Sequence, residues 1–129
     1  MKFMVLIYTD NAMLNALSTE QFDTTMRGCL AHADELRKEG RLLDSQLLEN
    51  ASKAKSVRTR NERVSIMDGP FAESKEMLAG FNVIEAENMD EAVKMAAEFP
   101  WTRTGCVEVR PIADFGAMRE RVGAESLGD

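Results

Sequence analysis

The chain contains few of the residues on which common functional motifs depend. Its 129 residues include one histidine, two cysteines and three prolines, and aromatic residues make up only 6%. A single histidine with scattered carboxylates does not have the ligand spacing of a zinc site, and the cysteines do not form a CxxC pair. Gly-rich phosphate loops, nucleophile elbows and dinucleotide-binding fingerprints are also absent. We therefore expect neither a metal nor a cofactor.

Long apolar runs are missing as well. A membrane helix needs about 20 consecutive apolar residues, and the run from Phe3 to Tyr8 is too short even for the apolar part of a signal peptide. The formal net charge of −6 argues against nucleic-acid binding, because phosphates would be repelled. Cys29 and Cys106 fall in a predicted helix and a predicted strand, and we expect both to be reduced, buried and inert. These features predict a cytoplasmic protein without membrane or nucleic-acid partners.

The remaining sequence is organised as alternating strands and helices. Ser18 to Gln21 has the pattern of a capping box and opens a helix that should run to about Glu39, where Gly40 ends it. A second capping box opens another helix at Asn88. Apolar or alternating runs predict the strands, two of which form a hairpin that turns at Asn61-Glu62. The predicted strands are 2–9, 41–48, 56–60, 63–68, 81–86 and 106–112.

This order predicts an α+β fold of the ferredoxin-like βαββαβ type with an added hairpin. Two helices cover one face of its antiparallel sheet, so the other face must be polar or buried against a second copy. We expect the second, a homodimer forming a dimeric α+β barrel, because strand residues of mixed character should lie there: Met4, Leu6, Tyr8, Asn82, Ile84, Glu108 and Arg110. Residues 1–112 are predicted to form the single domain, and 113–129 an extension that is partly helical and then frayed.

The segment from Asp68 to Glu76, DGPFAESKE, combines a tight turn with a dense group of charges. Gly69 tolerates the positive φ of a sharp turn and Pro70 fixes its own φ, so the neighbouring side chains lose little entropy on binding a ligand. One interpretation is a solvated turn whose charges aid solubility. The other is a preorganised rim of a cleft, in which Asp68, Glu73 and Lys75 contact a ligand.

His32 is the only side chain suited to proton transfer near neutral pH. On a helical wheel drawn at about 100° per residue, it lies about 95° from the centre of the apolar face, at the edge between buried and exposed positions. This position suits an acid or base that lines a cleft, and it equally suits a plain boundary histidine. Arg110 could hold the carboxylate of a ligand in a bidentate manner, or it could pair with Glu108 within the sheet. The catalytic hypothesis assigns proton transfer to His32 or Asp68, and substrate binding to Glu73, Lys75, Glu108 and Arg110.

The DGPFAESKE segment resembles the motif of the DGPF family, a branch of the YCII-related proteins. MKFMVLIY, LRKEGRLL, VRTR and GCVEVRPI extend the resemblance over nearly the whole chain. The resemblance implies a ferredoxin-like fold that dimerises into an α+β barrel, with a His–Asp pair in a cleft and activity on small cyclic organic acids in some relatives. The family histidine aligns near Cys29, and His32, three residues later on the same side of the helix, could take its place.

Two functions follow from these residues and this resemblance. The first is a homodimer with a small-molecule cleft that runs lyase- or isomerase-type acid–base chemistry on a small anionic organic acid. The second is a non-catalytic dimeric module that binds a metabolite or a regulatory partner, since the resemblance also implies an association with sigma factors. A third possibility is purely structural, with Pro70 and Phe71 packing at the dimer contact.

Overall fold

The computed structural model of the chain describes residues 1–125. Its central sheet contains four strands: β1 (Lys2–Asp10), β2 (Leu42–Leu47), β5 (Glu76–Glu85) and β6 (Gly105–Pro111). Their order is β2-β5-β1-β6, and every neighbouring pair is antiparallel. This is the predicted ferredoxin-like arrangement, with the N-terminal strand inside the sheet.

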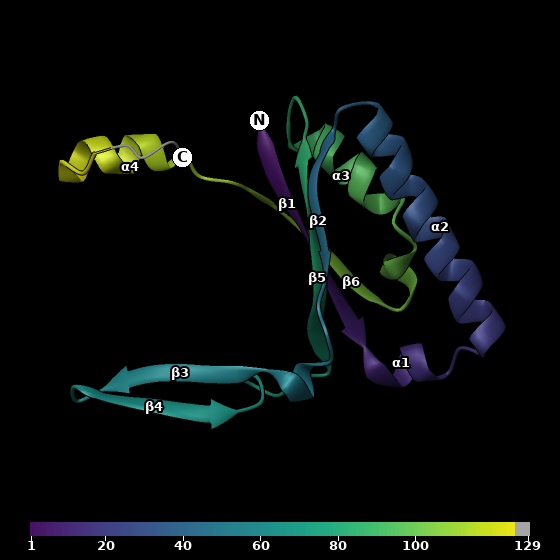
Figure 1. The fold of residues 1–129 in the computed structure, drawn as a ribbon. Coiled ribbons are helices and arrows are strands. Elements are labelled where there is room, and N and C mark those ends of the chain that lie inside the picture. Colours follow the sequence, from purple (N-terminus) through teal and green to yellow (C-terminus); the bar gives the residue numbers. More distant parts are fainter. Residues whose placement is uncertain (126–129) are drawn as a thin grey trace.

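Two helices, α2 (Thr19–Lys38) and α3 (Met89–Ala97), cover one face of this sheet (Figure 1). The predicted capping box is present: the Ser18 side chain accepts from the Gln21 backbone, and the Gln21 side chain accepts from the Ser18 backbone. Gly40, with φ of 73°, ends α2 in the left-handed conformation that glycine adopts without strain. The core between sheet and helices is built around Phe3, Val5, Ile84 and Phe99.

Three short helical turns connect these elements: α1 (Asn11–Asn15), η1 (Ala51–Lys53) and η2 (Pro100–Arg103). The sequence analysis did not predict α1. Asp10 caps it, because its carboxylate accepts from the backbone N–H groups of Ala12 and Met13 at 2.9 and 3.3 Å. Asp10 itself is buried, so β1 ends at a fixed polar group.

Two further elements project from the other side of the sheet (Figure 1): a hairpin of β3 (Lys55–Arg60) and β4 (Arg63–Asp68), and α4 (Phe115–Val122). The hairpin turn is where the sequence predicts it. Asn61 and Glu62 both have positive φ, 52° and 65°, as a two-residue type I′ turn requires. The predicted fraying of the chain end falls largely on residues 126–129, outside the described residues.

The open face of the sheet carries Met4, Leu6 and Tyr8 from β1, as predicted. Asn82 and Ile84 were expected there too, but that prediction is wrong: both are buried under the helices, at 4% and 0% exposure. They lie on the same side as Val5 and Phe3, with which they pair, so Phe81 and Val83 take the open-face positions of β5. No helix within residues 1–125 is long and apolar enough to cross a membrane.

Candidate functional site

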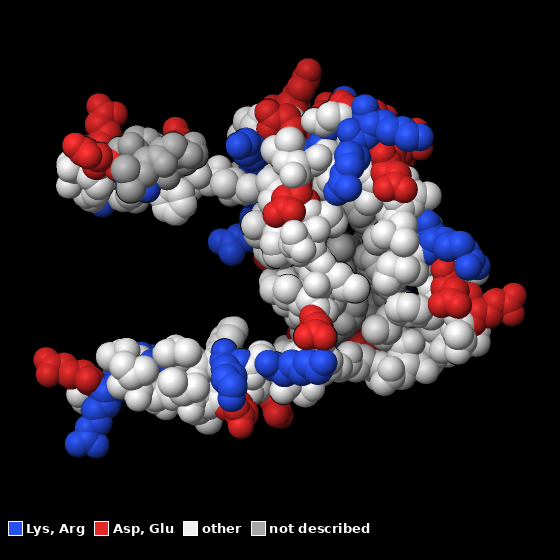
Figure 2. All heavy atoms as spheres, in the orientation of Figure 1, with Lys and Arg blue, Asp and Glu red and all other residues white. Residues whose placement is uncertain are grey.

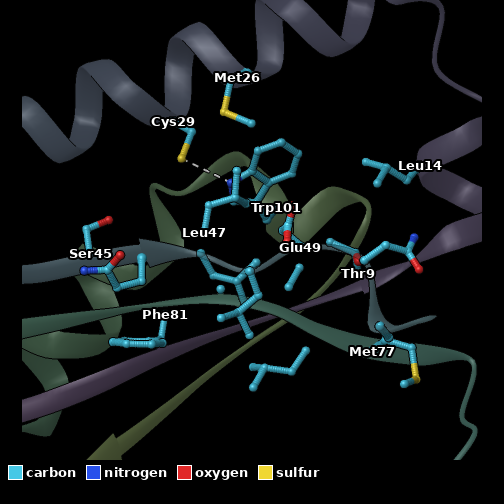
Figure 3. A pocket seen from close by; sticks show the side chains of 18 of the residues that line it. Thr9, Leu14, Met26, Cys29, Ser45, Leu47, Glu49, Met77, Phe81 and Trp101 are labelled. Atoms are coloured by element: carbon cyan, nitrogen blue, oxygen red, sulfur yellow. Dashed lines mark hydrogen bonds between the residues drawn. The ribbon is translucent and has the colours of Figure 1, made fainter. Parts of the chain in front are cut away.

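A cavity of about 350 Å³ lies between the sheet and α2, at the end where β1 runs into α1. Its wall is largely apolar: Leu14 comes from α1, Phe22 and Met26 from α2, Met77 from β5 and Trp101 from η2 (Figure 3). These four elements contribute to one space. A cavity of roughly 150 Å³ already holds a benzene ring, so this one can accommodate a substituted single-ring compound.

Two buried polar side chains line the cavity without hydrogen-bonding partners among residues 1–125. Thr9 on β1 is 8% exposed and Asn82 on β5 is 4% exposed. Among residues 1–125, the Thr104 hydroxyl is the only side-chain group that is fully buried and unpartnered, so the polar atoms of Thr9 and Asn82 are open to the cavity. The Thr9 hydroxyl and the Asn82 amide are therefore available to a ligand, the hydroxyl as donor or acceptor and the amide as both.

Cys29 forms part of the wall beneath α2. The Trp101 indole Nε1–H donates to its Sγ at 3.1 Å, which holds the indole ring in place (Figure 3). Burial raises the pKa of the Cys29 thiol, and the Trp101 hydrogen bond lowers it by less. The thiol is therefore neutral near pH 7 and is a poor nucleophile. Apart from Cys29, Glu49 is the one ionisable residue that residues 1–125 contribute to the lining.

A second, more open groove lies at the base of the hairpin. Pro70, Phe71 and Ala72 of the DGPF segment form one side, and Tyr8 and Leu78 of the open sheet face form another. The two spaces share the chain from Leu47 to Ala51 and residues 77–78 as a common wall. Phe71 is 78% exposed, so the DGPF corner presents an aromatic ring to its surroundings.

His32 lies on α2 where this helix contacts α3, and it lines neither the cavity nor the groove. Its Nε2 is 2.8 Å from the backbone carbonyl of Met95, and since a carbonyl only accepts, Nε2 donates. Its ring meets Phe99 edge-on with centroids 4.5 Å apart, and Nδ1 is 3.6 Å from Glu98. These contacts attach α2 to α3, as expected of a boundary histidine.

Asp68, Glu73 and Lys75 lie on the hairpin side of the molecule. Asp68 forms an exposed ion pair with Lys55 across the hairpin base. Lys75 reaches the buried carboxylate of Asp10, with 3.7 Å between Nζ and Oδ2. The charged segment is thus tied to the end of β1.

Glu108 and Arg110 lie on β6, opposite Leu6 and Met4. Glu108 accepts a hydrogen bond from the Tyr8 hydroxyl at 3.3 Å, and burial together with the Glu108 carboxylate raises the pKa of Tyr8. Arg110 is opposite Met4, whereas Lys75 contacts Asp10. At about 3.3 Å per strand residue, these two cations are separated by roughly 20 Å.

Within one chain, the predicted site residues therefore do not meet. His32 lies on the helix side of the sheet, and Asp68 lies in the hairpin on the other side (Figure 1). Cys106 was expected to be buried, and it is instead exposed on the open face beside Tyr8. The cavity residues were not predicted from the sequence. Two of its features point to them: an asparagine inside an apolar strand and the single tryptophan.

Comparison with known proteins agrees with the fold. The model of the YCII-related domain matches residues 1–116, so the chain belongs to the YCII-related family. It is also 35% identical over 115 residues to an uncharacterised protein, R00369, of Rhizobium meliloti strain 1021, covering 88% of this chain and 93% of that protein.

A solved structure shares the fold at lower sequence similarity. It is 5-chloro-2-hydroxyhydroquinone dehydrochlorinase (TftG) from Burkholderia phenoliruptrix AC1100, in complex with 2,5-dihydroxybenzoquinone. The TM-score is 0.53 at 16% identity, covering 88% of this chain and 94% of that one. This likeness confirms the α+β architecture.

Proposed function

We propose that the protein is a homodimer that binds a small, uncharged ring compound in the cavity between the sheet and α2. The observation that carries this proposal is the pair of unpartnered polar groups, Thr9 and Asn82, in a largely apolar cavity. Ligand pockets typically combine an apolar wall with a few placed polar groups. The lining contains no lysine or arginine, which favours hydroxyl or carbonyl substituents over a carboxylate. The quinone in the TftG complex carries hydroxyl and carbonyl substituents on one ring and no carboxylate.

The homodimer is supported by the open face of the sheet. Met4, Leu6 and Tyr8 are only partly covered there, and Leu78 is exposed. An antiparallel sheet with an apolar second face is stable when that face is covered. A second copy supplies a matching face through a two-fold axis, which is the commonest symmetry of soluble dimers.

Proton transfer by His32 and Asp68 on a small organic acid stays a prediction. Its geometric condition is that one site contains both residues. The single chain places them on opposite sides of the sheet (Figure 1), and the cavity lining provides only Glu49 and a neutral thiol as ionisable groups. The described contacts therefore favour ligand binding as the primary function.

Trp101 provides a direct test, because it is the only tryptophan in the chain and lines the cavity. Monocyclic phenols, hydroxybenzoates and lactones are titrated while the indole fluorescence and the melting temperature are followed. A ligand of the native state raises the melting temperature in proportion to the logarithm of its concentration. We expect neutral phenols and lactones to change both signals at lower concentrations than the hydroxybenzoates. A panel that changes neither signal at millimolar concentration would contradict the proposal.

A further inference from the structure

The β3–β4 hairpin has two chemically different sides. Residues that pair directly across the strands point to the same side of a hairpin. Val57 pairs with Ile66 and Thr59 with Val64, which forms an apolar side. The opposite side contains Arg58 paired with Ser65, and Arg60 paired with Arg63. The hairpin is therefore amphipathic, although it is not packed into the core.

The apolar side is largely uncovered in the single chain. Val57, Val64 and Ile66 are each 65% exposed, and the hairpin forms a two-stranded sheet of its own. An isolated two-stranded hairpin is marginally stable at best in water. A further surface must cover these side chains for the hairpin to be a stable part of the fold.

The surface area of the chain indicates how much has to be covered. A compact monomer of 14.4 kDa exposes about 6,800 Å² by the usual scaling with mass. This chain exposes 9574 Å², which is roughly 2,700 Å² more than that scaling gives. Obligate homodimers bury about 2,000–5,000 Å² or more summed over both copies, and the excess of two chains is roughly 5,400 Å², which is enough for an extended dimer contact.

The direction of the projecting elements points to the same occupant. The hairpin and α4 both extend on the side of the open sheet face, and a hollow lies between them (Figures 1 and 2). On α4, Phe115, Met118 and Val122 are exposed at helical spacing, which gives this element an apolar stripe too. A second copy that covers the open sheet face would enter this hollow.

Charge favours a copy of this chain over an unrelated apolar surface. The hairpin contains four basic residues, Lys55, Arg58, Arg60 and Arg63, and only two acidic ones, whereas the whole chain has a net charge of −6. The hairpin is thus basic and the rest of the chain is strongly acidic. Exchange of hairpins places each basic arm on an acidic body, and such complementarity guides association.

We propose that the β3–β4 hairpin is a clasp that holds the second copy, with Val57, Thr59, Val64 and Ile66 in the contact and the arginines on the side that faces away from it. This inference rests on the proposed homodimer and deepens it. It assigns the DGPF segment a position at the root of the clasp, where the Arg58 guanidinium donates to the Phe71 carbonyl at 3.4 Å and the Ser56 hydroxyl donates to the Gly69 carbonyl at 2.8 Å.

The hairpin can be excised at its root with loss of the Ser56 and Arg58 hydrogen bonds to the DGPF segment. The Gly69 N–H donates to the Ala54 carbonyl at 2.7 Å, so the two ends of the excised segment are already adjacent. A chain in which residues 55–68 are replaced by Asn-Gly, which favours a two-residue turn, keeps the whole central sheet. Sedimentation equilibrium measures its dimer dissociation constant, and circular dichroism confirms that the helices and sheet are intact.

Two charge-matched double variants locate the contact. Val64→Lys with Ile66→Lys changes the apolar side of β4, and Ser65→Lys with Met67→Lys adds the same charge to the other side of the same strand. We expect the first pair and the excised chain to raise the dissociation constant at least about tenfold, since each lost apolar contact is worth a large part of 1.4 kcal/mol. The second pair should change it by less than about threefold.

The outcomes separate this inference from the proposed dimer. If the native chain is a dimer and the excised chain dimerises as tightly, the clasp is refuted and the dimer stands. Equal weakening by the two double variants also refutes the assigned contact side. If the native chain sediments as a monomer at micromolar concentration, both the dimer and the clasp fall, whereas ligand binding detected through Trp101 fluorescence is unaffected.

Discussion

Asn82 is 4% exposed, and its amide lines the cavity without a hydrogen-bonding partner among residues 1–125. Replacing such a group by an apolar one of similar shape can be neutral or stabilising. We therefore expect Asn82→Leu to leave the melting temperature of the ligand-free protein unchanged or raised. The affinity for a ring ligand should fall about 3- to 10-fold, the value of one hydrogen bond. Thermal melts and Trp101 fluorescence titrations measure the two effects, and a variant that loses stability but keeps affinity would contradict the assignment.

His32 presents the opposite case, because both its hydrogen bond and its ring contact lie between two helices. His32→Ala removes the bond to Met95 and the edge-on contact with Phe99, so we expect a loss of about 2–3 kcal/mol in the free energy of unfolding. His32→Gln retains an N–H donor and should lose about half as much. Urea unfolding measures both losses. Ligand affinity should be unchanged in the Gln variant, and a selective loss of affinity there would instead support the predicted catalytic role.

At the level of elements, β1 and β6 approach so closely at Gly105 that a side chain cannot be accommodated. A Cβ at this position would lie 2.0 Å from the Tyr8 carbonyl oxygen. We expect Gly105→Ala to lower the free energy of unfolding by about 3 kcal/mol or more, because the strands must separate. Gly28→Ala on α2 is the control: a Cβ there meets no atom within 4 Å, and alanine should stabilise the helix by about 0.5–1 kcal/mol. Urea unfolding measures both changes in the free energy of unfolding. If the two substitutions change it in the same direction, this explanation of the close strand packing is refuted.

The elements that the sequence predicted are those with local signals. The boundaries of α2 follow from Ser18, Gln21 and Gly40, which act within a few residues of the chain. The hairpin follows in the same way from alternation and its turn. The cap residue Asp10 gave no such signal, because the five-residue helix that follows it is too short to show an apolar period. For this reason α1 was not predicted.

The cavity was beyond prediction for a different reason. Its walls come from segments as distant as Thr9 and Trp101, and only the packing of sheet against helix brings them together. Cys29 and His32 illustrate how fine the distinction is. They lie three residues apart on α2, yet Cys29 lines the cavity and His32 packs against α3. Three residues advance along the helix axis by about 4.5 Å, and the two side chains point in directions about 60° apart around it.

For the whole molecule, two raised pKa values make stability depend on pH in the alkaline range. Burial is the first cause of the raised pKa of both Tyr8 and Cys29. The folded chain holds these protons more tightly than the unfolded chain, whose values are near 10.0 and 9.0. Their contribution is complete below those values and is lost as the pH rises through the folded pKa values. Urea midpoints measured between pH 7 and 11 should therefore fall above about pH 9, and less so in Cys29→Ser.

The two cysteines also report on assembly, because one lies inside the fold and the other on the open face. Cys106 is exposed beside Tyr8 in the single chain, where a second copy would cover it. We expect a thiol-specific chromogenic disulfide to modify Cys106 slowly at protein concentrations where the dimer is populated, and faster on dilution below its dissociation constant. Cys29 should react slowly at every concentration, since burial both shields its sulfur and raises its pKa. Cys106→Ser shows which of the two rates belongs to Cys106.

The variant lacking residues 55–68 tests the same contact. As the protein is diluted, its Cys106 should become reactive at a higher protein concentration than in the native chain, because a weaker dimer dissociates at a higher concentration. A Cys106 rate that is fast and independent of concentration would show that the open face is not covered by a second copy.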